Sequence, residues 1–227
     1  MGGARNPIPP MLGSGGCHVK PAGIDSGGHR VGMPGMKSTA ASIPVECRCR
    51  RVQGDALTAS TYTRVTCYCR DCRAYAEWLG GDGLLDAAGG TDIVAMAPSG
   101  LRFTEGRDHI VSMSFSGKVY RWYAACCRTP LGNTARDPRV HYVGLCTACI
   151  PDGDALDASL GPAGRCVVNA ASATAAVSAT PLAFLHGGLR IATGVLGARM
   201  RGRRQSPFFD DALGRPIREP ERVARAD

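Results

Sequence analysis

The sequence lacks the motifs that define several large enzyme classes. It has no glycine-rich phosphate loop after a predicted strand, no Gly-x-Ser-x-Gly and no His-Glu-x-x-His. Nucleotide hydrolysis, serine hydrolysis and metalloprotease chemistry are therefore not supported. Residues 1–36 also lack the apolar run of a signal peptide. We expect a protein of the reducing cytoplasm, and the alternative is an exported protein built on disulfides.

Aromatic residues are scarce and unevenly placed. They make up 6% of the 227 residues, and none precedes Tyr62. Buried aromatic side chains help to offset the entropy of ordering a chain, so we place the folded body at residues 43–150. Residues 1–42 are rich in glycine and proline, which predicts a disordered extension in which Met36 is the expected true start. Residues 151–227 are expected to form a C-terminal extension.

The sequence also lacks a concentrated region of charge and a long uninterrupted apolar run. The net charge of +8 is spread along the chain, and the one basic cluster is Arg199, Arg201, Arg203 and Arg204. Nucleic acid is therefore not an expected partner. Residues 166–185 are uncharged, but polar side chains interrupt them and Pro181 breaks the run. No membrane span is expected.

The C-terminal extension contains one pattern typical of an amphipathic helix, at about residues 182–204. Apolar residues recur there at steps of three and four: Leu182, Leu185, Leu189, Ala192, Leu196 and Met200. We expect this stripe to dock on the core of the protein itself. The alternative is a surface helix for an acidic membrane or partner.

Cysteine, in contrast, is abundant, with 11 residues, and seven of them form three tight groups: Cys47-x-Cys49, Cys67-x-Cys69-x-x-Cys72 and Cys126-Cys127. In a reducing compartment, clustered cysteines more often bind metal or do redox work than form disulfides. Zinc prefers four thiolate or imidazole ligands in a tetrahedron, which closely spaced cysteines can supply. The middle group is the most specific signal, because three sulfurs within six residues can hold one ion.

The sequence around the cysteines predicts a mainly β domain. Residues 92–97, 101–104, 111–115 and 119–123 have the composition of strands, and the last two flank Ser116-Gly117-Lys118 as a hairpin that ends near Cys126. Residues 73–79 are expected to be helical and to end at Gly80. A helix start beside Cys67, Cys69 and Cys72 favours the thiolate form.

These residues resemble the family of glutathione-dependent formaldehyde-activating enzymes and centromere protein V. The resemblance covers about residues 45–135. It is carried by Cys47-x-Cys49, Cys67-x-Cys69-x-x-Cys72 and the run Arg121-Trp122-Tyr123-Ala124-Ala125-Cys126-Cys127-Arg128-Thr129-Pro130-Leu131-Gly132-Asn133. Three positions differ from the family pattern: Tyr68 replaces a His, Ala124 a Cys and Arg128 a Gly.

The resemblance implies a small zinc-binding antiparallel β-tent with two zinc ions. Cys47, Cys49 and Cys127 would belong to a structural site, and Cys126 is the nearest fourth ligand. Cys67, Cys69 and Cys72 would hold a catalytic zinc. The implied activity is that of a carbon–sulfur lyase, similar to S-(hydroxymethyl)glutathione synthase, acting on the adduct of a small aldehyde with glutathione or another small thiol.

Two alternatives remain open from the sequence. Cys146-x-x-Cys149 competes with Cys126 and Cys127 as the partner of Cys47 and Cys49. The whole domain can instead be a noncatalytic zinc module that binds a protein or nucleic acid, because four protein ligands at each ion would close both sites. In the enzyme, Arg70, Arg73 and Arg128 are candidates for binding the carboxylates of glutathione.

Overall fold

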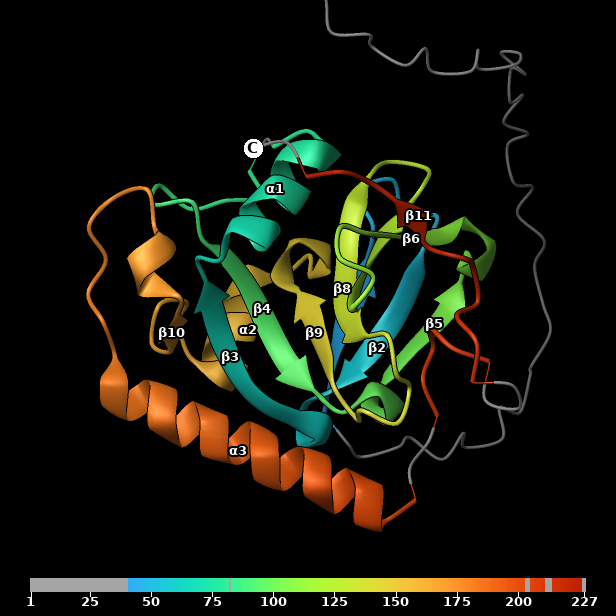
Figure 1. Ribbon diagram of the computed structural model, residues 1–227. Helices are drawn as coiled ribbons and strands as arrows, with labels where there is room; N and C mark the ends of the chain where they lie inside the picture. The colour runs from blue at the N-terminus through green and yellow to red at the C-terminus, as the bar shows by residue number, and fades with distance from the viewer. Residues whose placement is uncertain (1–40, 82, 203–204, 211–213, 226–227) are drawn as a thin grey trace, which may run out of the picture. The chain divides into compact units, whose positions relative to one another are not determined.

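The computed structural model describes residues 41–225, apart from residues 82, 203–204 and 211–213. The disordered extension predicted for residues 1–42 therefore lies almost wholly outside the described residues. The described chain contains eleven strands and three α-helices, which confirms the prediction of a mainly β protein (Figure 1).

A three-stranded antiparallel sheet has the order β1-β2-β5. It consists of β1 (Ser42–Glu46), β2 (Gln53–Leu57) and β5 (Leu101–Glu105). Side chains of β1 alternate between buried and exposed, with Ile43 and Val45 facing the core. This period of two is the pattern of a strand with one covered face.

An eight-stranded sheet forms the larger part of the structure, in the order β10-β3-β4-β9-β8-β7-β6-β11. The predicted hairpin is confirmed, because β6 and β7 pair antiparallel. The two edge strands pair in parallel and come from beyond residue 150, so this part of the chain completes the sheet. The strands are β3 (Thr61–Cys67), β4 (Thr91–Met96), β6 (Ile110–Ser114), β7 (Val119–Ala124), β8 (Thr129–Ala135), β9 (Val143–Cys146), β10 (Val167–Val168) and β11 (Glu221–Arg222).

Both sheets contribute to one main core. Trp122 of β7 is fully buried and stacks on Phe208, with 4.8 Å between ring centroids. Val45 of β1 and Leu131 of β8 belong to the same cluster of buried side chains. Phe208 therefore covers the core although it lies far beyond the predicted body.

Helices lie around the sheets: α1 (Arg70–Leu79), α2 (Gly153–Leu160) and α3 (Pro181–Met200). The α1 helix ends at Gly80, as predicted, with the left-handed φ of +119° that favours glycine. Among the described residues, no helix has the length and apolar character needed to cross a membrane. Short 3₁₀ helices occupy Thr58–Ser60, Pro98–Gly100, Arg107–His109, Thr147–Cys149 and Ala170–Ser172.

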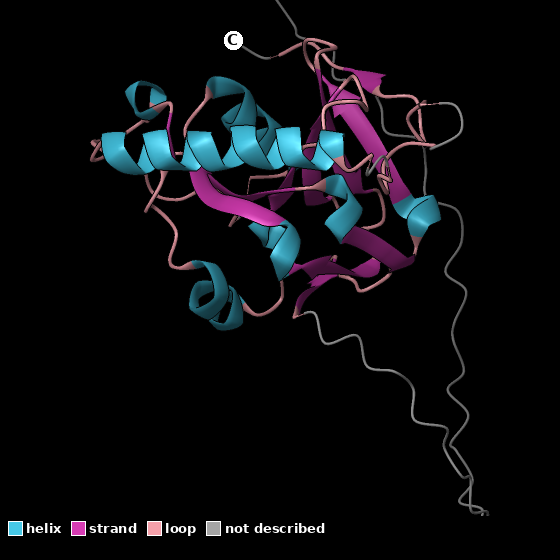
Figure 2. Ribbon diagram, turned by 90° about the horizontal axis from the view of Figure 1, so that it is seen from below, coloured by secondary structure: helices cyan, strands magenta, loops and turns pink. Residues whose placement is uncertain are grey.

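The α3 helix exists as predicted, but the expectation that its leucine stripe docks on the core is wrong. The helix packs on β3, β4 and β10 through its opposite face, where Gly187 and Ala198 are buried (Figure 2). A Cβ atom on Gly187 would lie 3.0 Å from the sulfur of Cys166, and one on Gly194 would overlap the ring of Tyr62. Small residues occupy the face of α3 that packs on the sheet, because they let the helix backbone approach the strands.

Substitutions at two glycines of α3 test this packing. Gly194→Ala places a methyl group in the ring of Tyr62, whereas a Cβ on Gly188 meets nothing within 4 Å. Both changes raise helix propensity equally, so the difference between them isolates the overlap. We expect the free energy of unfolding of Gly194→Ala, measured by urea titration, to be about 1–3 kcal/mol lower than that of Gly188→Ala. Equal free energies of unfolding would contradict the close approach of the α3 backbone to Tyr62.

Candidate metal centres

Four cysteines from two distant turns meet in one cluster. Cys47 and Cys49 lie in the turn between β1 and β2, and Cys126 and Cys127 lie in the turn between β7 and β8. Their four sulfur atoms lie within 4.8 Å of one another. We call Cys47, Cys49, Cys126 and Cys127 the four-cysteine cluster. It joins a turn of the three-stranded sheet to a turn of the eight-stranded sheet.

The sulfur separations in this cluster fit one tetrahedral ion. The Sγ atom of Cys126 lies 3.8 Å from that of Cys47, 3.3 Å from that of Cys49 and 3.9 Å from that of Cys127. A tetrahedron with metal–sulfur bonds of about 2.3 Å has edges of about 3.8 Å. The ten described cysteines are free thiols. The four-cysteine cluster can therefore hold a metal ion.

Hydrogen bonds fix the thiols of this cluster. The amide of Val52 donates to the sulfur of Cys47 at 3.3 Å, and the Oγ1 atom of buried Thr129 lies 3.1 Å from the sulfur of Cys127. Burial raises the pKa of Cys47 and of Cys126. Burial also opposes ionisation of Cys127, but hydrogen bonds with Thr129 lower its pKa to about 6. The hydrogen bonds with Thr129 therefore favour the thiolate form of Cys127.

Ala124 and Arg128, two positions at which the sequence differs from the family that it resembles, lie beside this cluster. Ala124 is buried at the end of β7, and Cys126 lies in the cluster. Arg128, at the position of the glycine, has a φ of +58°, in the left-handed region that glycine adopts most readily. The turn therefore keeps the backbone conformation of a glycine position although an arginine occupies it.

A second cluster lies at the start of α1. Cys67 ends β3, Cys69 is the N-cap of α1, and Cys72 lies in the first turn of the helix. The Sγ atom of Cys69 accepts a hydrogen bond from the amide of Cys72 at 3.4 Å. The three sulfurs lie within 4.8 Å of one another. We call Cys67, Cys69 and Cys72 the three-cysteine cluster, which can also hold a metal ion.

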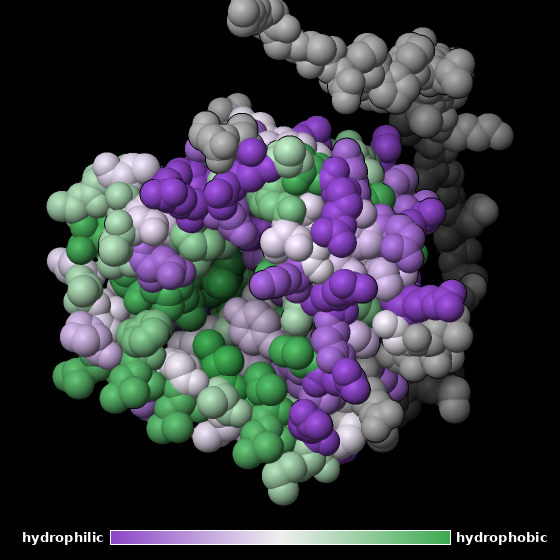
Figure 3. All heavy atoms as spheres, in the orientation of Figure 1, coloured by the Kyte–Doolittle hydropathy of each residue, from purple (hydrophilic) through white to green (hydrophobic). Residues whose placement is uncertain are grey.

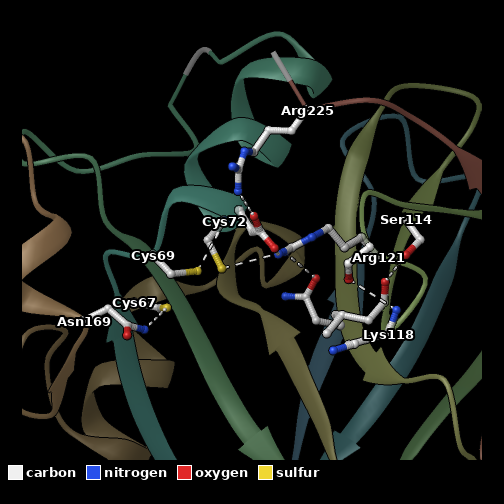
Figure 4. Close-up of polar contacts among 12 residues, drawn as sticks. Cys67, Cys69, Cys72, Ser114, Lys118, Arg121, Asn169 and Arg225 are labelled. Atoms are coloured by element: carbon white, nitrogen blue, oxygen red, sulfur yellow. Dashed lines mark hydrogen bonds and ion pairs between the residues drawn. The ribbon is translucent and has the colours of Figure 1, made fainter. Parts of the chain in front are cut away.

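Two polar side chains from other elements reach the sulfurs of the three-cysteine cluster (Figure 4). Asn169 donates from Nδ2 to Cys67 at 3.5 Å, and Arg121 of β7 donates from Nη1 to Cys72 at 3.7 Å. Hydrogen bonds from Cys67 and Cys69, helped by the charge of Arg121, lower the pKa of Cys72. Hydrogen bonds to Cys69 and Cys72 raise the pKa of Cys67. The surroundings of this cluster therefore favour the thiolate form most at Cys72.

A cavity of about 270 Å³ opens beside the three-cysteine cluster, between α1 and the large sheet. Cys72, Arg121 and Asn133 are among its lining residues. The side chain of Arg121 is 5% exposed, and its guanidinium donates to Oδ1 of Asn133 at 3.3 Å. Buried cations favour anionic neighbours. The sulfur-bearing side chain of Cys72 and the positively charged side chain of Arg121 therefore line the same small cavity.

The three arginines expected to bind carboxylates differ in their surroundings. Arg128 donates to the backbone carbonyls of Trp78 and Leu79 at the end of α1 and lies over the ring of Trp78. Arg73 donates to the carbonyl of Ser172 at 3.0 Å. Arg70 is exposed. None of the three is among the residues lining the cavity beside the three-cysteine cluster.

The competing pair Cys146 and Cys149 does not belong to either cluster. Both thiols are buried, and Cys149 donates to the carbonyl of Cys146 at 2.9 Å. Tyr68, which lies between Cys67 and Cys69 in sequence, donates from its hydroxyl group to Asp86 at 2.8 Å. Among the described residues, the groups that can hold a metal are the two cysteine clusters.

Sequence reasoning missed the two residues that contact the three-cysteine cluster from outside. Arg121 carried a signal, because it is a charged residue in the middle of an otherwise apolar strand, Val119–Ala124. Asn169 carried none, because it lies 102 residues from Cys67 in a segment of small residues.

These features define a cysteine-rich, mainly β protein with two candidate metal centres. The model of a family of unknown function (DUF6151) matches residues 39–221. The chain belongs to this family. No curated protein matches the sequence. A crystal structure of a Rhodobacter sphaeroides protein, a structural genomics target, is similar over 53% of this chain and 99% of its own, at 16% identity and a TM-score of 0.37.

Single cysteine substitutions test the two centres separately. Cys69→Ser removes one sulfur from the three-cysteine cluster, and Cys49→Ser removes one from the four-cysteine cluster. We expect each variant to lose one bound metal ion per chain by elemental analysis, with the circular dichroism of Cys69→Ser unchanged. Cys166→Ala, outside both clusters, is the matched control and should keep both ions. An unchanged metal content in Cys69→Ser would remove that residue from the ligand set.

Proposed function

We propose that the protein is a zinc enzyme with one structural and one reactive ion, acting on the adduct of a small aldehyde with glutathione or another small thiol. The supporting observation is the difference between the two clusters: one offers four sulfurs, and the other offers three beside a cavity. Structural zinc sites are closed by four protein ligands, whereas catalytic sites keep one position open.

Zinc is the proposed ion because the donors are all sulfur. Thiolate ligands in a tetrahedral arrangement are typical of zinc. Cys47, Cys49, Cys126 and Cys127 would hold the structural ion, and Cys67, Cys69 and Cys72 the reactive ion. The strand pairs whose turns carry the four-cysteine cluster, β1 with β2 and β7 with β8, are antiparallel, which supports the β-tent that the resemblance implies.

Zinc at the three-cysteine cluster would lower the pKa of a thiol that enters its open position. The protein contributes the surroundings of that thiol. Arg121 keeps a positive charge at the cavity wall, where it can bind a substrate carboxylate or the oxygen that gains charge during the reaction. Asn133 holds the guanidinium in place through its Oδ1 atom at 3.3 Å.

The proposed reaction is the addition of a thiol to an aldehyde, or its reverse. The thiol gives its proton to solvent, and a bond forms between its sulfur and the carbonyl carbon. The π electrons of the carbonyl move to oxygen, which takes a proton, so the product is a hydroxyalkyl thioether. The reverse reaction breaks the carbon–sulfur bond and releases thiol and aldehyde, as in a carbon–sulfur lyase.

Cobalt substitution with glutathione tests this proposal. We expect glutathione to change the visible absorption of the cobalt protein, because its sulfur enters the open position of the three-cysteine cluster. Cys69→Ser, which keeps the four-cysteine cluster, is the control and should show no change. We also expect the zinc protein to accelerate exchange between glutathione, formaldehyde and S-hydroxymethylglutathione, measured by NMR.

Two results would contradict the enzyme. A wild-type cobalt spectrum that glutathione leaves unchanged would indicate two closed sites and favour the noncatalytic zinc module. A thiol-dependent spectrum without accelerated exchange would show that the site binds thiols but does not act on their aldehyde adducts.

A further inference from the structure

The outward face of α3 is a continuous apolar surface. Leu182, Leu185, Leu189, Leu196 and Met200 recur at helical spacing, and their exposed fractions range from 58% to 83%. Among the described residues, eight large hydrophobic side chains are exposed, and six of them, Phe184 included, belong to α3. We call Leu182, Leu185, Leu189, Leu196 and Met200 the α3 stripe. Figure 3 shows apolar side chains along the edge where α3 lies.

The α3 stripe does not pack against the core of the protein itself. The other face of α3 already packs on the sheet, through Gly187, Gly194 and Ala198. The helix is therefore fixed in place while its largest apolar side chains point away from the protein. A contiguous exposed apolar surface of this kind is typical of an interaction site.

The charged side chains of α3 itself are of one sign. On a helical projection of 100° per residue, Arg190 lies on one side of the stripe and Arg199 on the other, and both are exposed. No aspartate or glutamate occurs between Cys166 and Phe209. Arginine on both flanks of an apolar stripe lets the guanidinium groups reach headgroups while the leucines enter the acyl boundary.

We propose that the α3 stripe binds the surface of a membrane that contains anionic lipids, with the helix lying in the plane of the interface. The absence of acidic residues over the whole segment favours phosphate headgroups, whose charge complements both flanks of the helix. The other occupants are a second copy of this chain, which would form a dimer through the stripe, and a protein partner, which would leave the purified chain a monomer that binds no vesicle.

The test uses the full chain and vesicles made of phosphatidylglycerol and phosphatidylcholine in equal parts. We expect the protein to sediment with these vesicles and to bind pure phosphatidylcholine vesicles more weakly. Leu189→Glu should lower the partition coefficient about tenfold or more, because it places a like charge in the middle of the stripe. Arg190→Glu should lower it for anionic vesicles and leave weak binding to neutral vesicles unchanged.

Val140→Glu is the matched control. Val140 is 41% exposed but lies outside α3, so the same change there should leave vesicle binding unaltered. An unchanged circular dichroism spectrum shows that each variant is folded. The proposal is overturned if the wild-type chain stays in solution with anionic vesicles, or if Leu189→Glu binds them as the wild type does. A dimer that Leu189→Glu dissociates, without vesicle binding, would assign the stripe to a second copy instead.

Discussion

The gathering of four cysteine sulfurs is the constraint on which the rest of the structure depends. Cys47 and Cys49 come from the small sheet, and Cys126 and Cys127 from the large one, so the cluster fastens the two sheets together. Thiolates at separations of 3.3 to 3.9 Å repel each other unless protons or a cation lie among them. In a small β structure, metal binding at such a cluster adds directly to the free energy of folding.

The α1 helix connects the four-cysteine cluster to the three-cysteine cluster. Its N-terminal end carries Cys69 and Cys72, and its C-terminal carbonyls accept hydrogen bonds from Arg128, which follows the four-cysteine cluster in sequence. One arginine in a left-handed conformation thus links the four-cysteine cluster to the helix that carries Cys69 and Cys72. Arg121 contacts the three-cysteine cluster from β7, the strand that leads to Cys126 and Cys127.

Local patterns were sufficient for much of the fold and for the cysteine groups. Alternating side chains and Ser116-Gly117-Lys118 predicted the hairpin of β6 and β7. Spacing together with the family resemblance singled out the seven cysteines that the structure gathers into two clusters. The orientation of α3 was not predictable from hydrophobicity, because close packing on the sheet selects glycine over leucine. The roles of Phe208 and Asn169 depend on contacts across the chain, which no local pattern encodes.

X-ray absorption at the metal edge tests the central claim most directly. The two clusters together predict a zinc edge and a sulfur shell at about 2.3 Å. Its average occupancy should lie between three and four sulfur atoms per metal, since one centre has four cysteines and the other has three. A shell of oxygen and nitrogen atoms alone, or protein that contains no transition metal, would contradict the account.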